Sequence, residues 1–228
     1  MLAPLRLISS MAAREVLAEL SAQFTSATGV PVNAEAAGGV EVARRVAAGE
    51  AADVVVLAST AIDRLIADGR LQPGRVDLVR SGVAIAVRTG ATRPDIGSEQ
   101  AVRRAVEAAR SVSYSTGPSG VHLEKVFARW GVLDALRPRI VVPAPGVPVG
   151  TLVAGGQAEL GFQQLSELLT LPGIDVLGPL PPSIQSITTF SGGVCVQSAQ
   201  AEGAWALLAF MAAPAAAQVK QRFGMEPA

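Results

Sequence analysis

Cysteine and histidine are almost absent from this 228-residue sequence, which has one of each. A single cysteine, Cys195, excludes an internal disulfide and any metal site built from several cysteines. It lies in the apolar run 193–196, which predicts a buried and inert thiol. The motifs GxGxxG, HExxH, GxSxG and CxxC and the Walker loop are also missing. The usual signatures of nucleotide-binding proteins, zinc proteases and α/β-hydrolases are therefore absent, and we expect no metal and no cofactor.

Charged and aromatic side chains are scarce as well. Charged residues make up 17% of the chain and aromatics 4%, and the 19 basic and 19 acidic side chains cancel. No basic run interleaved with aromatics marks a nucleic-acid face, so we expect no nucleic-acid partner. No apolar stretch is long enough to cross a bilayer, which predicts no membrane insertion. The first ten residues lack the regions of an export leader, so we expect a cytoplasmic protein, or a periplasmic one if a leader has been removed.

The sequence does have a large apolar fraction in a regular order. Half of the residues are hydrophobic, which is enough for a sizeable core. Strands are predicted at 5–9, 31–35 and 53–57. Each is followed by a helical pattern, at 11–28, 40–48 and 60–67 respectively. This alternation predicts a doubly wound α/β layer.

The β/α alternation starts again near residue 83. Further strands are predicted at 79–87 (interrupted at 80–82), 111–115, 140–142, 159–162, 175–177 and 187–196, and further helices at 98–110, from 119 onward, and at 150–155, 201–212 and 214–223. A Pro-rich linker covers 143–148. This order predicts two α/β lobes, each a mixed sheet flanked by helices: residues 1–82 and 187–228 form lobe 1, and 83–186 form an inserted lobe 2. We expect the ligand between the lobes, where strands end.

Four turns of small polar residues separate a strand from a helix: Ser9-Ser10, Gly38-Gly39, Ser59-Thr60 and Ser115–Gly120. Each supplies backbone N–H groups at a helix start, and three add hydroxyls, which suits a small anion. Any single turn could instead be an ordinary helix cap, and Ser59 is predicted to cap the helix at 60–67. The two glycines would also let backbone approach a ligand closely. The predicted ligand contacts from these turns are Ser9, Ser10, Gly38, Gly39, Ser59, Ser115, Thr116, Ser119 and Gly120.

Four more side chains are candidates, each with a plainer alternative. Arg80 is either a charge partner for a carboxylate ligand or a solvated edge residue. Gln163 follows a strand and either orients a polar ligand or belongs to a loop or a helix cap. His122, in the first turn of the helix that Ser119 would cap, either moves a proton as a neutral imidazole or is a surface residue. Tyr114 is the second candidate proton carrier, or else a core residue.

Several stretches resemble a known family. The Ser9-Ser10 helix start and the segments 46–57, 150–161 and 206–224 resemble the periplasmic molybdate-binding proteins of ABC transporters. The resemblance implies the type II periplasmic-binding fold, with an anion between two lobes. Gly38-Gly39 departs from the hydroxyl residues that the family usually has there, and we expect no export signal of the kind that the family carries. Segments 114–122, 161–164 and 187–191 look more like a divergent branch similar to bacterial aconitate isomerase.

Two functions follow from these resemblances. As an isomerase, the protein would bind a di- or tricarboxylate through the turn donors and shift an allylic proton, with His122 or Tyr114 as the base and no cofactor. As a binding protein, it would hold molybdate or another anion with the same donors and need no proton carrier.

Overall fold

The computed structural model describes residues 3–144 and 146–228; Pro145, in the predicted linker 143–148, lies outside the described residues. The chain divides into two compact units. Unit 1 runs to Ser81 and resumes at Thr189, and unit 2 is Gly82–Thr188. The chain therefore passes between the units after residues 81 and 188, whereas the predicted lobes change after residues 82 and 186.

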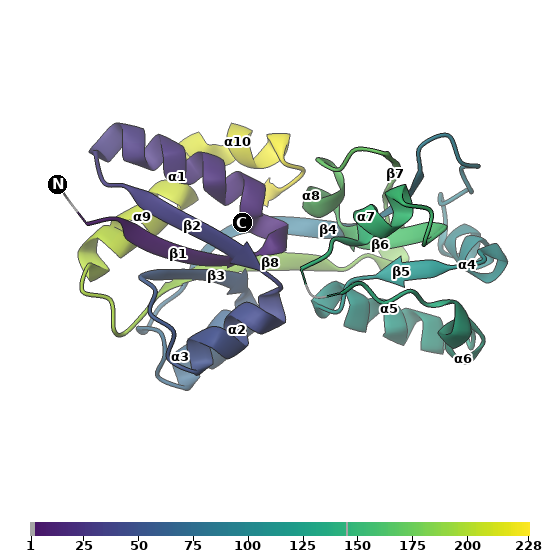
Figure 1. The fold of residues 1–228 in the computed structure, drawn as a ribbon, viewed down its shortest axis with the longest axis horizontal. Helices are drawn as coiled ribbons and strands as arrows, with labels where there is room; N and C mark the ends of the chain where they lie inside the picture. The colour runs from purple at the N-terminus through teal and green to yellow at the C-terminus, as the bar shows by residue number, and fades with distance from the viewer. Residues whose placement is uncertain (1–2, 145) are drawn as a thin grey trace. The chain divides into compact units, whose positions relative to one another are not determined.

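Unit 1 is a mixed sheet with helices on both faces (Figure 1). Its strands are β1 (Leu5–Ser10), β2 (Val32–Ala37), β3 (Val54–Ala58), the first part of β4 (Val76–Arg88), most of β8 (Ile187–Val194) and β9 (Glu226–Pro227). Its helices are α1 (Arg14–Thr28), α2 (Gly39–Ala47), α3 (Ser59–Ala67), α9 (Ala201–Ala212) and α10 (Ala217–Arg222), with 3-10 turns at Met11–Ala13 and Pro214–Ala216.

The strands of unit 1 follow the order β2-β1-β3-β8-β4, and β9 pairs with β4. Strand β1 is parallel to both β2 and β3, as the predicted β/α alternation requires. Strand β8 returns antiparallel to β3, with Leu57 opposite Ser191. Because β1, β2 and β3 are parallel, their carboxyl ends lie at one edge of the sheet.

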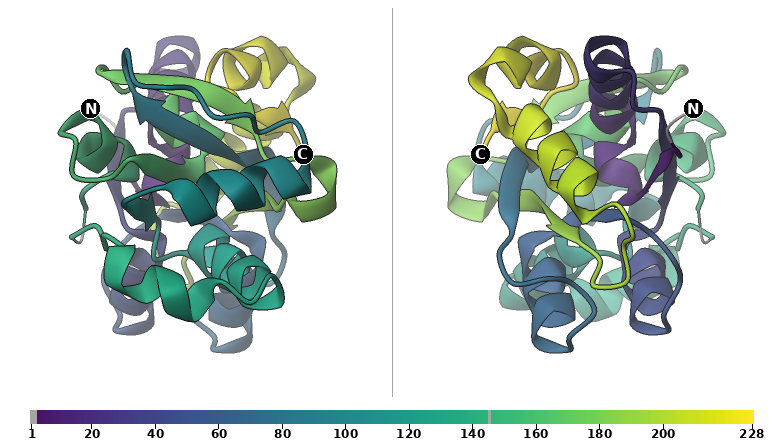
Figure 2. Two further views of the ribbon diagram at one scale, coloured as in Figure 1. Left: turned by 90° about the vertical axis from the view of Figure 1, so that its right-hand side faces the viewer. Right: turned by 90° about the vertical axis from the view of Figure 1, so that its left-hand side faces the viewer.

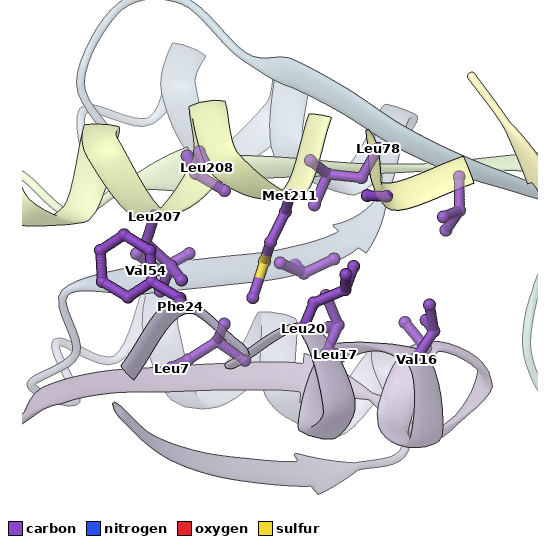
Figure 3. Packing of buried hydrophobic residues seen from close by; sticks show 14 of the residues in the cluster. Leu7, Val16, Leu17, Leu20, Phe24, Val54, Leu78, Leu207, Leu208 and Met211 are labelled. Carbon is purple, nitrogen blue, oxygen red and sulfur yellow. The ribbon is translucent and has the colours of Figure 1, made fainter. Parts of the chain in front are cut away.

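The core of unit 1 lies on both faces of this sheet. Helices α1, α9 and α10 cover one face, and α2 and α3 cover the other (Figures 1 and 2). Figure 3 shows Met211 of α9 pointing toward Leu20 of α1, above strand residues of the same cluster. Cys195 is buried, as predicted, in the cluster on the face that α2 and α3 cover, and burial raises the pKa of its thiol to about 11.

Unit 2 is a smaller mixed sheet in the order β7-β4-β6-β5. Its elements after β4 are α4 (Glu99–Ala108), β5 (Val112–Tyr114), α5 (Pro118–Arg129), α6 (Leu133–Leu136), α7 (Val149–Ala154), β6 (Leu160–Gln164), α8 (Leu165–Leu168) and β7 (Ile174–Pro179), with 3-10 turns at Arg137–Arg139 and Pro182–Ile184. Helices α4, α5 and α6 pack on the face that carries Phe162, and α7 and α8 pack on the opposite face.

Several predicted boundaries are wrong. Strand β4 runs without interruption through residues 80–82. The predicted strand at 140–142 is only an isolated bridge between Val112 and Ile140. Strand β6 includes Gln163 and Gln164, which were predicted to follow it. Residues 11–13 form a 3-10 turn instead of the start of α1.

Candidate functional site

Three of the four predicted polar turns meet at the carboxyl edge of unit 1. The register of the parallel strands places Ser10 opposite Ala37, and Ser9 opposite Val56. Helices α2 and α3 begin directly after β2 and β3, at this same edge. We call this group the unit 1 edge; its members are Ser9, Ser10, Gly38, Gly39 and Ser59.

The hydroxyls of the unit 1 edge differ in their partners. Ser9 Oγ donates a long hydrogen bond of 3.5 Å to the Glu35 carbonyl, and Ser59 Oγ donates at 3.2 Å to the Thr189 carbonyl. Ser59 is the first residue of α3 and Ala58 is the N-cap residue, so the prediction that Ser59 caps this helix is wrong. Ser10 Oγ is buried and has no partner among the described residues. A buried hydroxyl without a partner costs about 1–3 kcal/mol, so Ser10 is poised to bond to a ligand oxygen or a water.

The N-terminal end of α2 has backbone N–H groups with space beside them. Gly38 is the N-cap residue and no side chain among residues 3–144 and 146–228 caps the helix, so the first N–H groups of α2 keep their bonding capacity. A Cβ on Gly38 would have no atom of a described residue within 4 Å, and one on Gly39 would lie 3.5 Å from Ser10 Cβ. Neither glycine has a positive φ. Space is therefore left beside the positive end of the α2 dipole, where an anion is stabilised.

The fourth turn lies at the carboxyl edge of unit 2. Parallel strands β5 and β6 place Tyr114 opposite Phe162, so the turn after β5 and the amides at the end of β6 are neighbours at this edge. We call this group the unit 2 edge; its members are Ser115, Thr116, Ser119, Gly120, Gln163 and Gln164.

The turn after β5 packs closely against the first residues of α5. Gly117 is the N-cap residue and Pro118 begins the helix, so Ser119 is not the N-cap, as had been predicted. Its buried hydroxyl instead lies 2.7 Å from Ser115 Oγ. A Cβ on Gly120 would lie 1.7 Å from the Ser115 carbonyl oxygen, so only glycine fits there. Thr116 is exposed.

Gln163 and Gln164 are buried and point to opposite faces of β6. Gln163 donates its Nε2 at 2.8 Å to Glu167, and Gln164 donates at 2.9 Å to Thr188 Oγ1. Both Oε1 atoms are buried without a partner among the described residues. The two side chains do not cap α8, and in the described part of the chain no other side chain does so. They add two buried acceptors to the unit 2 edge.

His122 lies in the second turn of α5, as its fifth residue, and not in the first turn as predicted. It is half-buried, and its Nε2 lies 2.9 Å from the Ile184 carbonyl oxygen. Tyr114 is buried, and its hydroxyl donates at 3.1 Å to Glu124. Burial, with a further contribution from Glu124, raises the pKa of Tyr114 to about 12. A hydroxyl this difficult to ionise is poorly suited to accept a proton at neutral pH.

Arg80 belongs to neither edge group. Its side chain is exposed on β4, and its Nη2 lies 3.7 Å from Glu226 on β9. No sequence pattern indicated Ile184, whose carbonyl oxygen contacts His122, or the neighbouring Gln185.

Among residues 3–144 and 146–228, no group of three or more His, Cys, Asp or Glu side chains is placed to hold a metal ion. Within the same ranges, no helix has the length and apolar character needed to span a membrane.

Comparison with known proteins relates this geometry to a family. The family described as bacterial extracellular solute-binding protein matches residues 5–226. The aconitate isomerase of a Pseudomonas species is 38% identical over 229 residues, which cover 98% of this chain and 87% of that protein.

Solved structures share the fold. The periplasmic molybdate-binding protein of Azotobacter vinelandii superposes with a TM-score of 0.80 at 21% identity, over 97% of this chain and 98% of that one. The sulfate-binding protein of Mycobacterium tuberculosis does so with a TM-score of 0.77 at 15% identity, over 98% and 86%. The predicted type II periplasmic-binding fold and the resemblance to molybdate-binding proteins are confirmed, and the chain belongs to the bacterial extracellular solute-binding protein family.

Proposed function

We propose that this protein binds a small di- or tricarboxylate and shifts an allylic proton on it without a cofactor, as an aconitate isomerase would. The observation that carries the proposal is the 38% identity to an aconitate isomerase along 98% of the chain. The geometry of the edges agrees with it. Each unit has one edge with neutral hydrogen-bonding groups, and a ligand with two or three carboxylates offers several acceptors to such groups.

The chemistry needs only binding groups and one base. Removing an allylic proton places negative charge on the adjacent carboxylate, where backbone N–H groups and hydroxyls stabilise it. Of the two candidate bases, His122 is better suited than Tyr114, because burial makes the tyrosine hydroxyl harder to ionise.

A second candidate function is the binding of an oxyanion without chemistry. It is favoured by the fold shared with the molybdate-binding and sulfate-binding proteins. An open helix start and an unpartnered serine hydroxyl would serve such an anion equally well.

Thermal melting against a panel of anions separates the two functions. A ligand that binds only the folded protein at 100 times its Kd stabilises by about 2.7 kcal/mol, which raises Tm by about 5–10 °C at this size. We expect this shift with cis- and trans-aconitate, and interconversion of the two when followed by proton NMR. A shift with molybdate, tungstate or sulfate but none with aconitate would refute the isomerase proposal and support the oxyanion binder.

Ser10→Ala tests the unit 1 edge, and the chain offers a matched control. Ser21 Oγ in α1 is also a buried hydroxyl without a partner among the described residues. Removing either hydroxyl should leave the Tm of the free protein unchanged or slightly raised, because no bond is lost. Only Ser10→Ala should reduce the shift caused by aconitate. Equal shifts in the two variants would remove Ser10 from the site.

A further inference from the structure

The contact of His122 determines which ring nitrogen carries a proton. Its Nε2 lies 2.9 Å from the Ile184 carbonyl oxygen, which can only accept a hydrogen bond. Nε2 must therefore carry the hydrogen. In the neutral ring the proton is then absent from Nδ1, which becomes the basic nitrogen. Nδ1 has no hydrogen-bond partner within residues 3–144 and 146–228.

The Ile184 carbonyl is held in place by the residue that follows it. The Gln185 side-chain oxygen accepts from the Val83 N–H at 2.9 Å and from the Ser186 N–H at 2.8 Å. Its amide nitrogen donates to the carbonyls of Val83 at 3.0 Å and Leu180 at 3.3 Å. Four hydrogen bonds from one side chain thus fix the segment beside β4. Ile184 itself is buried, so its carbonyl has little freedom to turn away from the histidine.

His122 lies on α5, the helix that carries Ser119 and Gly120 of the unit 2 edge. Gly120, two residues before His122, lets the Ser115 turn approach α5 closely. The start of α5, with the Ser115–Ser119 hydroxyl pair, and the imidazole are therefore parts of one element. A ring fixed at Nε2 and carried on this helix presents a single basic atom in a constant position.

We infer that Nδ1 of His122 is the atom that takes and returns the proton, and that the Ile184 carbonyl, held by Gln185, is the positioning group that makes it so. The inference rests on the proposed isomerase function. Nδ1 takes a proton from the allylic carbon, and the electron pair of the broken C–H bond delocalises through the double bond to the adjacent carboxylate. The imidazolium then carries a hydrogen on each nitrogen. Nδ1 returns its proton to the carbon two positions away, the double bond moves, and the neutral ring is restored, so atoms and charge balance without a co-reactant.

Because His122 is the only histidine, nitrogen NMR of the full chain labelled with 15N-histidine reads this ring alone. We would record the spectrum without ligand at a mildly alkaline pH of about 8.5. The expected spectrum shows one neutral tautomer with the hydrogen on Nε2. A hydrogen on Nδ1, or an even mixture of tautomers, would overturn the inference.

Three variants connect the tautomer to turnover. His122→Gln keeps an N–H donor for the Ile184 carbonyl but has no basic atom, so we expect aconitate Kd within about threefold of wild type and kcat reduced about 10²–10⁴-fold. Gln185→Leu should reduce kcat by about tenfold or more and produce a mixture of tautomers, whereas Gln157→Leu, at an exposed position of unit 2, should change neither. Retained turnover in His122→Gln would overturn the inference. Wild-type protein that binds aconitate without turnover would refute the proposed function instead, and the two failures are therefore distinguishable.

Discussion

Replacing Gly120 by alanine tests the geometry at the start of α5 most directly. In an ordinary helix, alanine is favoured over glycine by about 1 kcal/mol, so a sequence-based expectation is that Gly120→Ala stabilises the protein. The structure predicts the opposite sign. The new Cβ would lie 1.7 Å from the Ser115 carbonyl oxygen, which is backbone and cannot rotate away.

The magnitude can be worked out from the contacts that must change. Overpacking of this kind costs about 1–3 kcal/mol, and displacing the turn would also break the hydroxyl pair between Ser115 and Ser119, worth about 1 kcal/mol. After the helix gain is subtracted, a net loss of about 2 kcal/mol remains. At this chain length it lowers Tm by about 4–8 °C. Scanning calorimetry or dye-based melting of the purified variant measures the shift.

Gly38→Ala is the matched control. Gly38 has a negative φ that alanine can adopt, and no described residue would lie within 4 Å of its Cβ, so the free energy of unfolding of the variant should lie within about 1 kcal/mol of wild type. Both variants should weaken ligand binding, one by moving the Ser115 turn and the other by filling space beside α2. A Gly120→Ala protein with unchanged or raised Tm would refute the close approach on which this reasoning depends.

Three further predictions concern ionisable groups. Hydrogen bonding to Arg45 is the largest effect that lowers the pKa of Glu50 to about 2. The stabilising contribution of the Glu50 carboxylate is therefore present above pH 4.5 and lost as pH falls toward 2. In urea unfolding, the free energy of unfolding of Glu50→Gln should fall less steeply over this pH range than that of wild type. Burial raises the pKa of Tyr114 to about 12, so its contribution is present below pH 10 and lost as pH rises toward 12, a loss that Tyr114→Phe should remove. Lys220 is 1% exposed and burial lowers its pKa, so Lys220→Met should raise the free energy of unfolding by about 1 kcal/mol, whereas Lys125→Met at an exposed position should not.

The sequence predicts those parts of the fold that depend on local patterns. The order of strands and helices in unit 1 follows from apolar periodicity and short joints, and α9 occupies the residues predicted for it. The meeting of Ser10 with the start of α2 also follows, since parallel strands end at one edge. These features need no knowledge of distant contacts.

The incorrect predictions concern side chains whose hydrogen-bond partners are far away in the sequence. Ser59 was predicted as a cap because serine favours that position, but its hydroxyl donates to Thr189, 130 residues away. His122 was placed one turn too early because the helix begins at Pro118, and its partner Ile184 is 62 residues away. No local pattern encodes such contacts, so the candidate positions could be predicted but the bonding state of each side chain could not.

Strand β8 has a consequence for how the chain folds as it leaves the ribosome. It lies between β3 and β4, yet it is synthesised about 100 residues after β4 and about 130 residues after β3. Unit 1 therefore lacks an inner strand, and its first helix lacks the cover of α9, until translation is almost complete. Unit 2 is one continuous segment and can finish first. A nascent chain that ends before Thr189 would expose an open edge on β3, where pairing with other chains competes with folding.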